Sequence, residues 1–304
     1  MKSFLDQHFG PSWTAKKIMG DSGERQYHRV SIKDKTCILA SYPPNTQKSF
    51  KSFVSVQDLF KRKDFSVPSI LAQDNHNGFV LLEDLGSVSL EQFYLESHVL
   101  DFHKMALDCL WSLQEDVSSD DLKTSFSVNQ GLHEMIFTYQ QFNHAFLEDD
   151  KKKLFEEFRD INEKIVQPPL VPSHRDFHSR NLFIYKDQVY IIDFQDAGFY
   201  PVYYDLVSLI EDPYSALSDE EKQLLIKYYE KKWNKSVDMY KFQLTTIQRL
   251  FKATGSFMSF FHLRGQNNHL KYIHSSLKKV ESILVQWNEY PYFLKYVQLL
   301  LSRL

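Results

Sequence analysis

Residues 168–198 read PPLVPSHRDFHSRNLFIYKDQVYIIDFQDAG. Two short apolar segments in this stretch, 182–185 and 189–193, alternate in a way that is typical of β-strands. The polar residues between them, Lys186-Asp187-Gln188, favour a tight turn. The pattern therefore predicts a β-hairpin centred near Asp187, in a part of the chain that is otherwise rich in helical patterns.

Three polar side chains around this hairpin suit one kind of chemistry. The hairpin returns the chain so that Asp193 is expected beside Asn181, and Asp176 precedes Asn181 by five residues. The oxygens of Asn181 and Asp193 suit Mg²⁺, which takes its remaining ligands from water and phosphates. Asp176, with no metal to hold, can orient a hydroxyl group and accept its proton. The order H-R-D, then N, then D-F is that of a kinase-type catalytic loop and predicts phosphoryl transfer.

The neighbouring residues have plainer interpretations. His174 is interpreted as structural support for the loop. Asp205, in PVYYDLVSL (201–209), is expected near the start of a helix, where it either caps the helix or holds the catalytic-loop backbone by hydrogen bonds; both alternatives stay open. His178 has no second His or Cys at ligand spacing, so it is interpreted as a loop-packing residue.

The composition of the chain is that of a folded protein. Of its 304 residues 43% are hydrophobic and 25% charged, and the formal net charge is −3. This balance gives no reason to expect nucleic acid or an anionic membrane as a partner. No run approaches the roughly 18 apolar residues of a membrane span, and two cysteines are too few for a disulfide framework. We expect a cytoplasmic protein that needs no obligate protein partner, with most of its aromatic rings in the core.

The pattern changes near Gly86. Before it, β-prone segments at 25–42 and 78–86 enclose one amphipathic segment at 50–60, which predicts a small sheet with one helix. Beyond it the hydrophobic spacing is helical. We therefore predict an α+β protein with a sheet lobe at 1–85 and a helical lobe at 86–304. The predicted helices lie near 89–115, 131–147, 150–165, 218–233, 240–262 and 272–287.

Four blocks of sequence resemble the aminoglycoside phosphotransferase-like branch of the protein-kinase-like fold, and within it the bacterial anomeric sugar kinases that act on N-acetylmuramate and N-acetylglucosamine. The blocks are GDSGERQYHRV (20–30), GFVLLEDLG (78–86), HRDFHSRNLF…IIDFQDA (174–197) and QRLFKATGSF…LRG…KYI (248–273). The third block is specific for the kinase-like fold, and the QRLFK block narrows the resemblance toward the sugar 1-kinases.

This resemblance implies a bilobal kinase fold in one catalytic domain, with ATP in the cleft between the lobes. The hinge would be 83–86, where Glu83 to Leu85 offer backbone groups to adenine. Asp176 would be the catalytic base, and Asn181 and Asp193 would hold Mg²⁺. The first block would be the hairpin over the phosphates, whose expected contacts include Gly20, Asp21, Ser22 and Gly23.

One feature departs from the general kinase pattern. The third strand, TCILASYPP (36–44), lacks the lysine that grips the α- and β-phosphates. Arg25 and Arg29 alternate on the preceding strand and point to one face. We hypothesise that Arg25 or Arg29 replaces this lysine; the alternative is that both are surface residues of an edge hairpin.

The predicted acceptor is a sugar. From residue 201 to 304 there are ten Asp and Glu against fourteen Lys and Arg, an excess of positive charge that suits a polycation poorly. Arg264 or Arg249 would meet the lactyl carboxylate of N-acetylmuramate, and Asp196 would point toward the sugar. Two alternatives remain: a kinase of the same fold for another hydroxylated acceptor, such as an aminoglycoside or choline-like compound, and a nucleotide-binding pseudokinase or scaffold.

Overall fold

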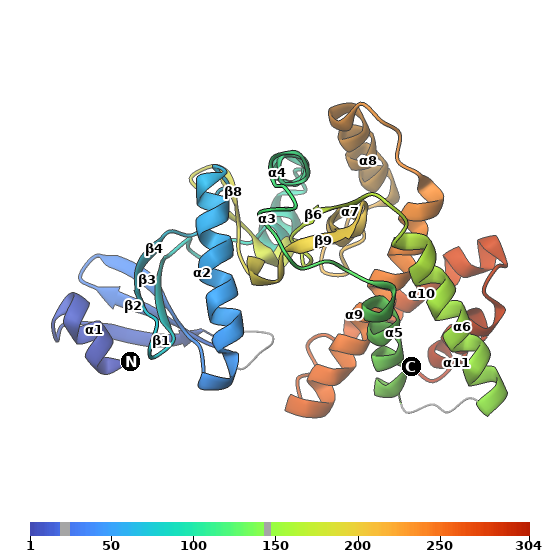
Figure 1. Cartoon of the computed structure of the whole chain (residues 1–304), viewed down its shortest axis with the longest axis horizontal. Coiled ribbons are helices and arrows are strands. Elements are labelled where there is room, and N and C mark those ends of the chain that lie inside the picture. The colour runs from blue at the N-terminus through green and yellow to red at the C-terminus, as the bar shows by residue number, and fades with distance from the viewer. Residues whose placement is uncertain (19–24, 143–146) are drawn as a thin grey trace. The chain divides into compact units, whose positions relative to one another are not determined.

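The computed structural model describes residues 1–18, 25–142 and 147–304, and its contacts group them into two compact units (Figure 1). The sheet unit contains 1–93 and 180–197, and the helical unit contains 94–179 and 198–304. This grouping differs from the predicted lobes in two ways. The boundary lies at 93 instead of 85, and the hairpin around Asp187 belongs with the N-terminal sheet.

The sheet unit is built on an antiparallel sheet of five strands in the order β1-β2-β3-β5-β4. The β-prone segments at 25–42 and 78–86 are confirmed as strands, whereas β1 and β4 were not predicted. Residues Lys33 and Asp34 form the turn between β2 and β3, with Lys33 in the left-handed region at φ 51°. The bounds are β1 Thr14–Ile18, β2 Gln26–Ile32, β3 Lys35–Ser41, β4 Ile70–Asp74 and β5 Phe79–Glu83.

Helices lie on both sides of this sheet (Figure 1). On one side α1 (Lys2–Phe9) buries Phe4 and Leu5 against strand residues such as Leu39. On the other side lies α2 (Gln47–Arg62), which confirms the predicted helix at 50–60 and extends it at both ends. Apolar residues recur along α2 with helical period, so it buries one face.

The predicted hairpin is confirmed as β7 (Leu182–Tyr185) and β8 (Gln188–Ile191). Its turn has two residues, Lys186 and Asp187, and not the predicted three. Both have positive φ, at 52° and 59°, as a type I′ turn requires. The Ile184 N–H donates to the Val88 carbonyl at 2.9 Å, a contact that ties the hairpin to the rest of the sheet unit.

The helical unit confirms the helical pattern predicted beyond Gly86, with two differences. The segment at 89–115 forms two helices, because the chain turns at His98, where φ is 54°. The last helix was not predicted, although Pro291 stands at a helix N-terminus, where proline is favoured. The helices are α3 Leu90–Ser97 (which spans the unit boundary), α4 Asp101–Asp116, α5 Val128–Gln141, α6 Glu148–Ile165, α7 Tyr204–Ile210, α8 Asp219–Trp233, α9 Met239–Arg264, α10 Lys271–Trp287 and α11 Pro291–Leu301.

The core of the helical unit is aromatic, as the composition predicts. Rings of α6, α9 and α11 meet there: Phe158 and Phe251 each lie 4.9 Å from Phe293, measured between ring centroids. Helices α5 and α9 approach closely because Gly255 has no side chain; a Cβ atom at this position would lie 2.2 Å from Thr138 Oγ1. Within the described ranges, no helix is long and apolar enough to cross a membrane.

A short ribbon in the helical unit leads into the predicted catalytic loop. Strand β6 (Leu170–Ser173) pairs antiparallel with β9 (Gly198–Pro201), and Ser173 lies opposite Gly198. His174 follows β6 directly, so the H-R-D sequence begins where this ribbon ends.

The buried His103 of α4 generates a pH prediction. Its ring is fully buried against Tyr94, and neither ring nitrogen has a hydrogen-bond partner among the described residues. Burial lowers the pKa of His103 from 6.5 to about 4, although Glu221 opposes the shift. The folded state therefore binds fewer protons than the unfolded state between these values, and the free energy of unfolding falls as the pH drops from about 6.5 to 4.

In His103→Leu this part of the pH dependence is expected to disappear, a change in slope of up to about 1.4 kcal/mol per pH unit. Urea unfolding at several pH values measures it. The control is His274→Leu, at an exposed position of α10 that stays in water in both states. An unchanged slope in His103→Leu would contradict the assignment.

Candidate active site

The predicted catalytic residue Asp176 lies in the helical unit, in the loop that follows β6. Two carboxylates hold the backbone of this loop. Asp205, at the start of α7, accepts hydrogen bonds from the N–H groups of His174 and Arg175, the latter at 3.0 Å. The structure therefore shows the second alternative for Asp205, in which it binds the loop backbone through hydrogen bonds. These hydrogen bonds also explain how Arg175 keeps a left-handed backbone with φ 83°.

The far end of the loop is held by Asp212, which was not predicted as a site residue. Its carboxylate accepts from the backbone N–H of Ser179 at 2.8 Å and from the Ser179 hydroxyl at 2.5 Å. Asp205 is fully buried and Asp212 is 4% exposed. Inside the loop the buried His174 Nδ1 lies 3.3 Å from the backbone N of Asp176. The loop around Asp176 is thus anchored at both ends.

Two cations of α9 face Asp176. Lys252 Nζ lies 3.5 Å and Arg249 Nη1 lies 3.7 Å from the same oxygen, Oδ1. Burial alone would raise the pKa of the Asp176 carboxyl, but the charges of Lys252 and Arg249 outweigh it and hold the pKa well below its ordinary value. Asp176 is therefore a carboxylate throughout the neutral range, which leaves it able to accept a proton.

Further groups complete this charged cluster. The Arg249 guanidinium lies over the Tyr204 ring, 4.5 Å from its centroid, and donates to the Tyr204 hydroxyl at 3.1 Å. Glu134 of α5 accepts from Gln248 at 2.9 Å and pairs with Arg175 at 3.6 Å. Three members of this cluster were not predicted from the sequence: Lys252, Glu134 and Tyr204. The spacing of Arg249 and Lys252, three residues apart on one helix face, was the signal for Lys252.

The predicted metal ligands lie in the sheet unit. The backbone carbonyl of Asn181 accepts from the Ile192 N–H at 3.0 Å, so the ends of the hairpin place Asn181 close to Asp193. Phe194 is buried and stacks on Phe53 of α2, with ring centroids 5.0 Å apart, which fixes the residue after Asp193. An amide oxygen and a carboxylate fit a Mg²⁺ ion that takes other ligands from phosphates. In the described ranges no group of three or more acids, His or Cys forms a complete metal cage.

Arg25 and Arg29 have different partners. Arg25, whose side chain is 15% exposed, pairs with Asp193 at 2.9 Å. Arg29 pairs with Asp84 of the predicted hinge, with Nε 2.7 Å and Nη2 3.0 Å from the two carboxylate oxygens. Arg25 thus lies beside the predicted metal ligand Asp193, whereas Arg29 binds Asp84 of the predicted hinge.

The other predicted contacts are spread over the chain. The Glu83 N–H donates to the Ser69 carbonyl at 2.9 Å, so an adenine contact at the hinge would use other backbone groups, such as those of Leu85. Asp196 is exposed and accepts from Gln195 at 3.2 Å. The predicted phosphate contacts Gly20, Asp21, Ser22 and Gly23 lie outside the described residues.

Arg249 and Arg264 do not share one location. They are fifteen residues apart on the continuous helix α9, which separates their Cα atoms by about 22 Å. Arg264 is exposed at the end of that helix, over the Phe260 ring. Of the two, Arg249 is the one beside Asp176.

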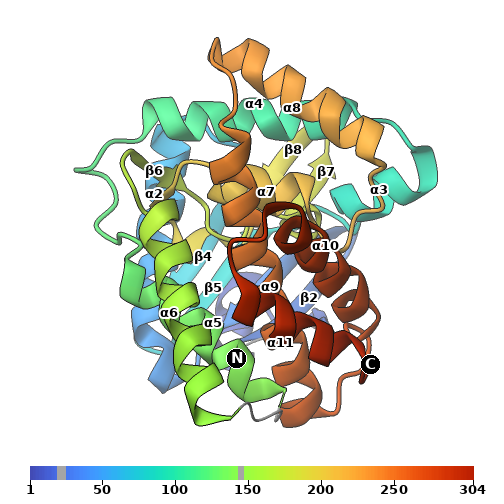
Figure 2. The same ribbon diagram turned by 90° about the vertical axis from the view of Figure 1, so that its right-hand side faces the viewer.

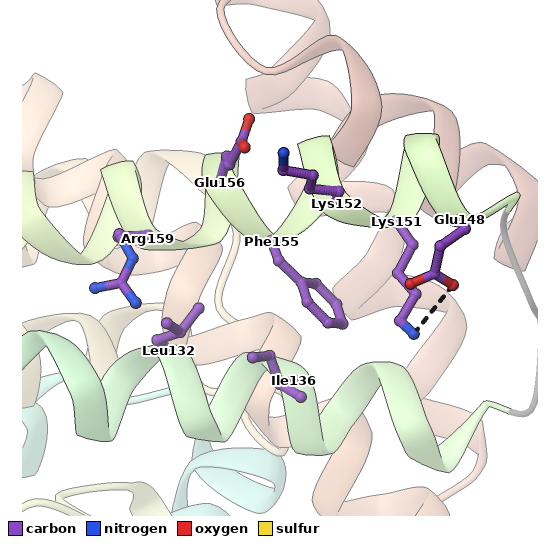
Figure 3. A pocket seen from close by; sticks show the side chains of 8 residues that line it. All are labelled: Leu132, Ile136, Glu148, Lys151, Lys152, Phe155, Glu156 and Arg159. Carbon is purple, nitrogen blue, oxygen red and sulfur yellow. Dashed lines mark ion pairs between the residues drawn. The ribbon is translucent and has the colours of Figure 1, made fainter.

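A separate surface groove of about 430 Å³ lies between α5 and α6 (Figure 3). Figure 2 shows these two helices side by side. The ring of Phe155 points into the groove toward Ile136, and Lys151 and Glu148 form an ion pair at its end. None of the residues that line it was predicted for catalysis, so we place no part of the site there.

Comparisons with known proteins identify the family of this chain. Residues 14–238 match the model of the phosphotransferase enzyme family. The chain is 27% identical to the N-acetylmuramate/N-acetylglucosamine kinase of Neisseria meningitidis over 82% of this chain and 79% of that protein. It is 28% identical to the protein of the same name from Pseudomonas aeruginosa, over 82% and 78%.

Solved structures confirm the predicted fold class. The choline kinase LicA of Streptococcus pneumoniae matches with a TM-score of 0.71 at 13% identity, covering 92% of this chain and 97% of that one. The ADP-bound aminoglycoside phosphotransferase APH(2'')-Ib matches with a TM-score of 0.64 at 12% identity, covering 91% and 96%. These matches establish the fold alone. The family makes the chain an ATP-dependent phosphotransferase for a small molecule.

The anchoring role of Asp205 generates a prediction. Burial raises the pKa of Asp205 to about 6, against the opposing hydrogen bonds from the loop. Below that pH the carboxyl is protonated and holds the loop less well, so we expect kcat to fall as the pH drops through about 6. In Asp205→Asn, where one acceptor oxygen is lost, kcat is expected to fall about 100-fold and to lose this acid limb.

The measurement is the pH profile of kcat, with the exposed Asp120→Asn as the matched control. Wild-type kcat in Asp205→Asn, or an acid limb that persists in it, would overturn the anchoring role.

Proposed function

We propose the following activity for this chain, which belongs to the phosphotransferase enzyme family: it transfers the γ-phosphoryl group of ATP to the anomeric hydroxyl of N-acetylmuramate or N-acetylglucosamine. The product is a sugar 1-phosphate, of use in cell-wall recycling. The enzyme acts in the cytoplasm on a small-molecule sugar and needs no nucleic acid, membrane or protein partner.

The observation that carries the choice of acceptor is the charge around Asp176. Two cations, Lys252 and Arg249, lie within 4 Å of its carboxylate. A cationic acceptor such as an aminoglycoside or choline would bring a further positive charge to this place and be repelled. A neutral or anionic sugar is not repelled by these two cations. The relatives that share 27% and 28% identity carry the names of kinases for these sugars, which supports the same choice.

The basicity of Asp176 suits an anomeric hydroxyl. A carboxylate whose pKa is held low is a weak base, and it is matched best to an acidic proton. The ring oxygen makes the anomeric hydroxyl more acidic than other sugar hydroxyls. Asp176 accepts that proton as the acceptor oxygen bonds to the γ-phosphorus, while the bond from γ-phosphorus to the bridging oxygen breaks and its electron pair leaves with ADP.

Residues of the sheet unit hold the nucleotide in this proposal. Asn181 and Asp193 supply oxygen ligands for Mg²⁺, which when bound neutralises charge on the phosphates. Arg25, beside Asp193, takes the place of the lysine that the third strand lacks. Arg29 holds the hinge through Asp84, so its contribution to phosphate binding is indirect.

A panel of acceptors tests the proposal. We expect ADP release with N-acetylmuramate and N-acetylglucosamine, and none with choline or aminoglycosides, and ³¹P NMR should show the phosphoryl group on C1. In Asp176→Asn the turnover is expected to fall by about 100- to 10,000-fold, because the proton acceptor is lost. The matched control is Asp187→Asn at the exposed hairpin turn. Turnover confined to a non-sugar would refute the substrate, and full activity in Asp176→Asn would refute the base.

The two arginines give a second test. Arg25→Ala is expected to lower kcat/KM for ATP by about 10- to 100-fold, because a charged hydrogen bond to phosphate is lost. Arg29→Ala is expected to lower the melting temperature of the protein, with a smaller effect on kcat/KM. Equal effects of the two variants on kcat/KM for ATP would contradict this division.

A further inference from the structure

Lys252 lies beside Asp176 but has no part in the proton transfer proposed above. It lies on α9, its side chain is 18% exposed, and its ammonium group lies 3.5 Å from Asp176 Oδ1. Placing a lysine in such a position requires removing most of its water, which is unfavourable unless an opposite charge replaces it. An apolar side chain of similar length would pack there at lower cost. The lysine therefore points to a function with Asp176.

The other charges around Asp176 show what Lys252 adds. Arg175 and His178 come from its own loop, Arg249 and Lys252 from α9, and these four lower its pKa. Tyr204 faces the cluster from α7, and Glu134 from α5. Counting formal charges without His178, the three basic residues balance the carboxylates of Asp176, Glu134 and Asp205, the last of which interacts with Arg249. Without Lys252 the cluster would carry a negative excess beside the proposed reacting oxygen.

The two cations of α9 have different contacts. Arg249 stacks on Tyr204 and donates to its hydroxyl, so part of its role is to hold α9 against α7. Lys252 has a flexible stem and a compact charge, and its ion pair is with Asp176 itself. Removing Lys252 therefore changes the charge at Asp176 with less effect on helix packing than removing Arg249.

We propose that Lys252 is a positioning residue for the catalytic carboxylate: its ammonium group fixes the direction of the Asp176 Oδ1 oxygen, so that the carboxylate can receive the acceptor hydroxyl. This inference rests on the proposed role of Asp176 as base. In this inference α9 contributes to the reaction through Lys252, which orients Asp176 from outside the H-R-D loop. Lys252 acts through Asp176, so it affects turnover more than it affects the binding of ATP.

The first experiment follows the Asp176 carboxyl directly and needs no acceptor. Protein with ¹³C-labelled aspartate carboxyls is titrated by NMR, and the signal missing in Asp176→Asn identifies Asp176. The wild-type carboxyl should stay ionised at pH values low enough to protonate an ordinary aspartate. In Lys252→Met its affinity for a proton should rise at least about tenfold, one pKa unit, because a nearby positive charge is gone. Lys252→Arg should restore most of the wild-type behaviour.

The second experiment separates kcat from KM with whichever acceptor the wild-type enzyme phosphorylates best. Lys252→Met should lower kcat by about 10- to 100-fold with KM for ATP changed less than about threefold, and Lys252→Arg should recover most of kcat. Lys241→Met is the matched control, since Lys241 lies near the start of the same helix and donates to the Gln167 carbonyl. A pH–rate profile alone would not isolate Asp176, because Asp205 has a pKa of about 6.

The outcomes distinguish this inference from the proposed function. If Asp176→Asn retains turnover, the proposed base is wrong. If Asp176→Asn is inactive while Lys252→Met titrates and turns over like wild type, the role of Lys252 is wrong and that of Asp176 stands. Loss of activity in Lys252→Met and Lys252→Arg alike, with an unchanged Asp176 titration, means a packing role and overturns the inference. A raised pKa of Asp176 with rescue by arginine supports it.

Discussion

Two buried carboxylates accept hydrogen bonds from the backbone of residues 174–179, and the rest of the candidate site depends on this constraint. Asp205 and Asp212 accept backbone N–H groups at the two ends of this loop. Arg175 keeps a left-handed backbone there, a conformation that costs a non-glycine residue about 1–3 kcal/mol. Without those acceptors the loop would relax, and Asp176 would lose its direction. The hydrogen-bond capacity of two buried acids thus determines where the predicted catalytic acid points.

Charge compensation around Asp176 depends in turn on how the helices pack. Helix α9 brings Arg249 and Lys252 to the loop, and α5 brings Glu134 to Gln248 and Arg175. The two helices lie close because Gly255 offers no Cβ to the Thr138 side chain. A methyl group there would force the helices apart or the threonine aside. Gly255, about one helical turn beyond Lys252 on α9, thereby contributes to the electrostatics of the site.

The sheet unit positions its share of the site by aromatic packing. Phe194 follows Asp193 and is buried between Phe53 and Phe60 of α2, so the turn that carries Asp193 is fixed by apolar contacts. The Ser52 hydroxyl adds a hydrogen bond to the Gln195 carbonyl. Arg25 compensates the Asp193 carboxylate at 2.9 Å. The D-F pair therefore combines a predicted metal ligand with a residue that anchors it.

The sequence alone determined what depends on local spacing. The alternation of apolar residues predicted the hairpin of β7 and β8 and the helix α2, and the order H-R-D, N, D-F predicted Asp176, Asn181 and Asp193, because these signals lie within a few residues of one another. The tertiary structure alone decided which distant side chains meet: Lys252 and Glu134 at the loop, Asp84 at Arg29, and the wide separation of Arg249 from Arg264. Those contacts join residues far apart in the chain, and they are set by helix packing and by the direction of each helix face, which spacing along one segment does not encode.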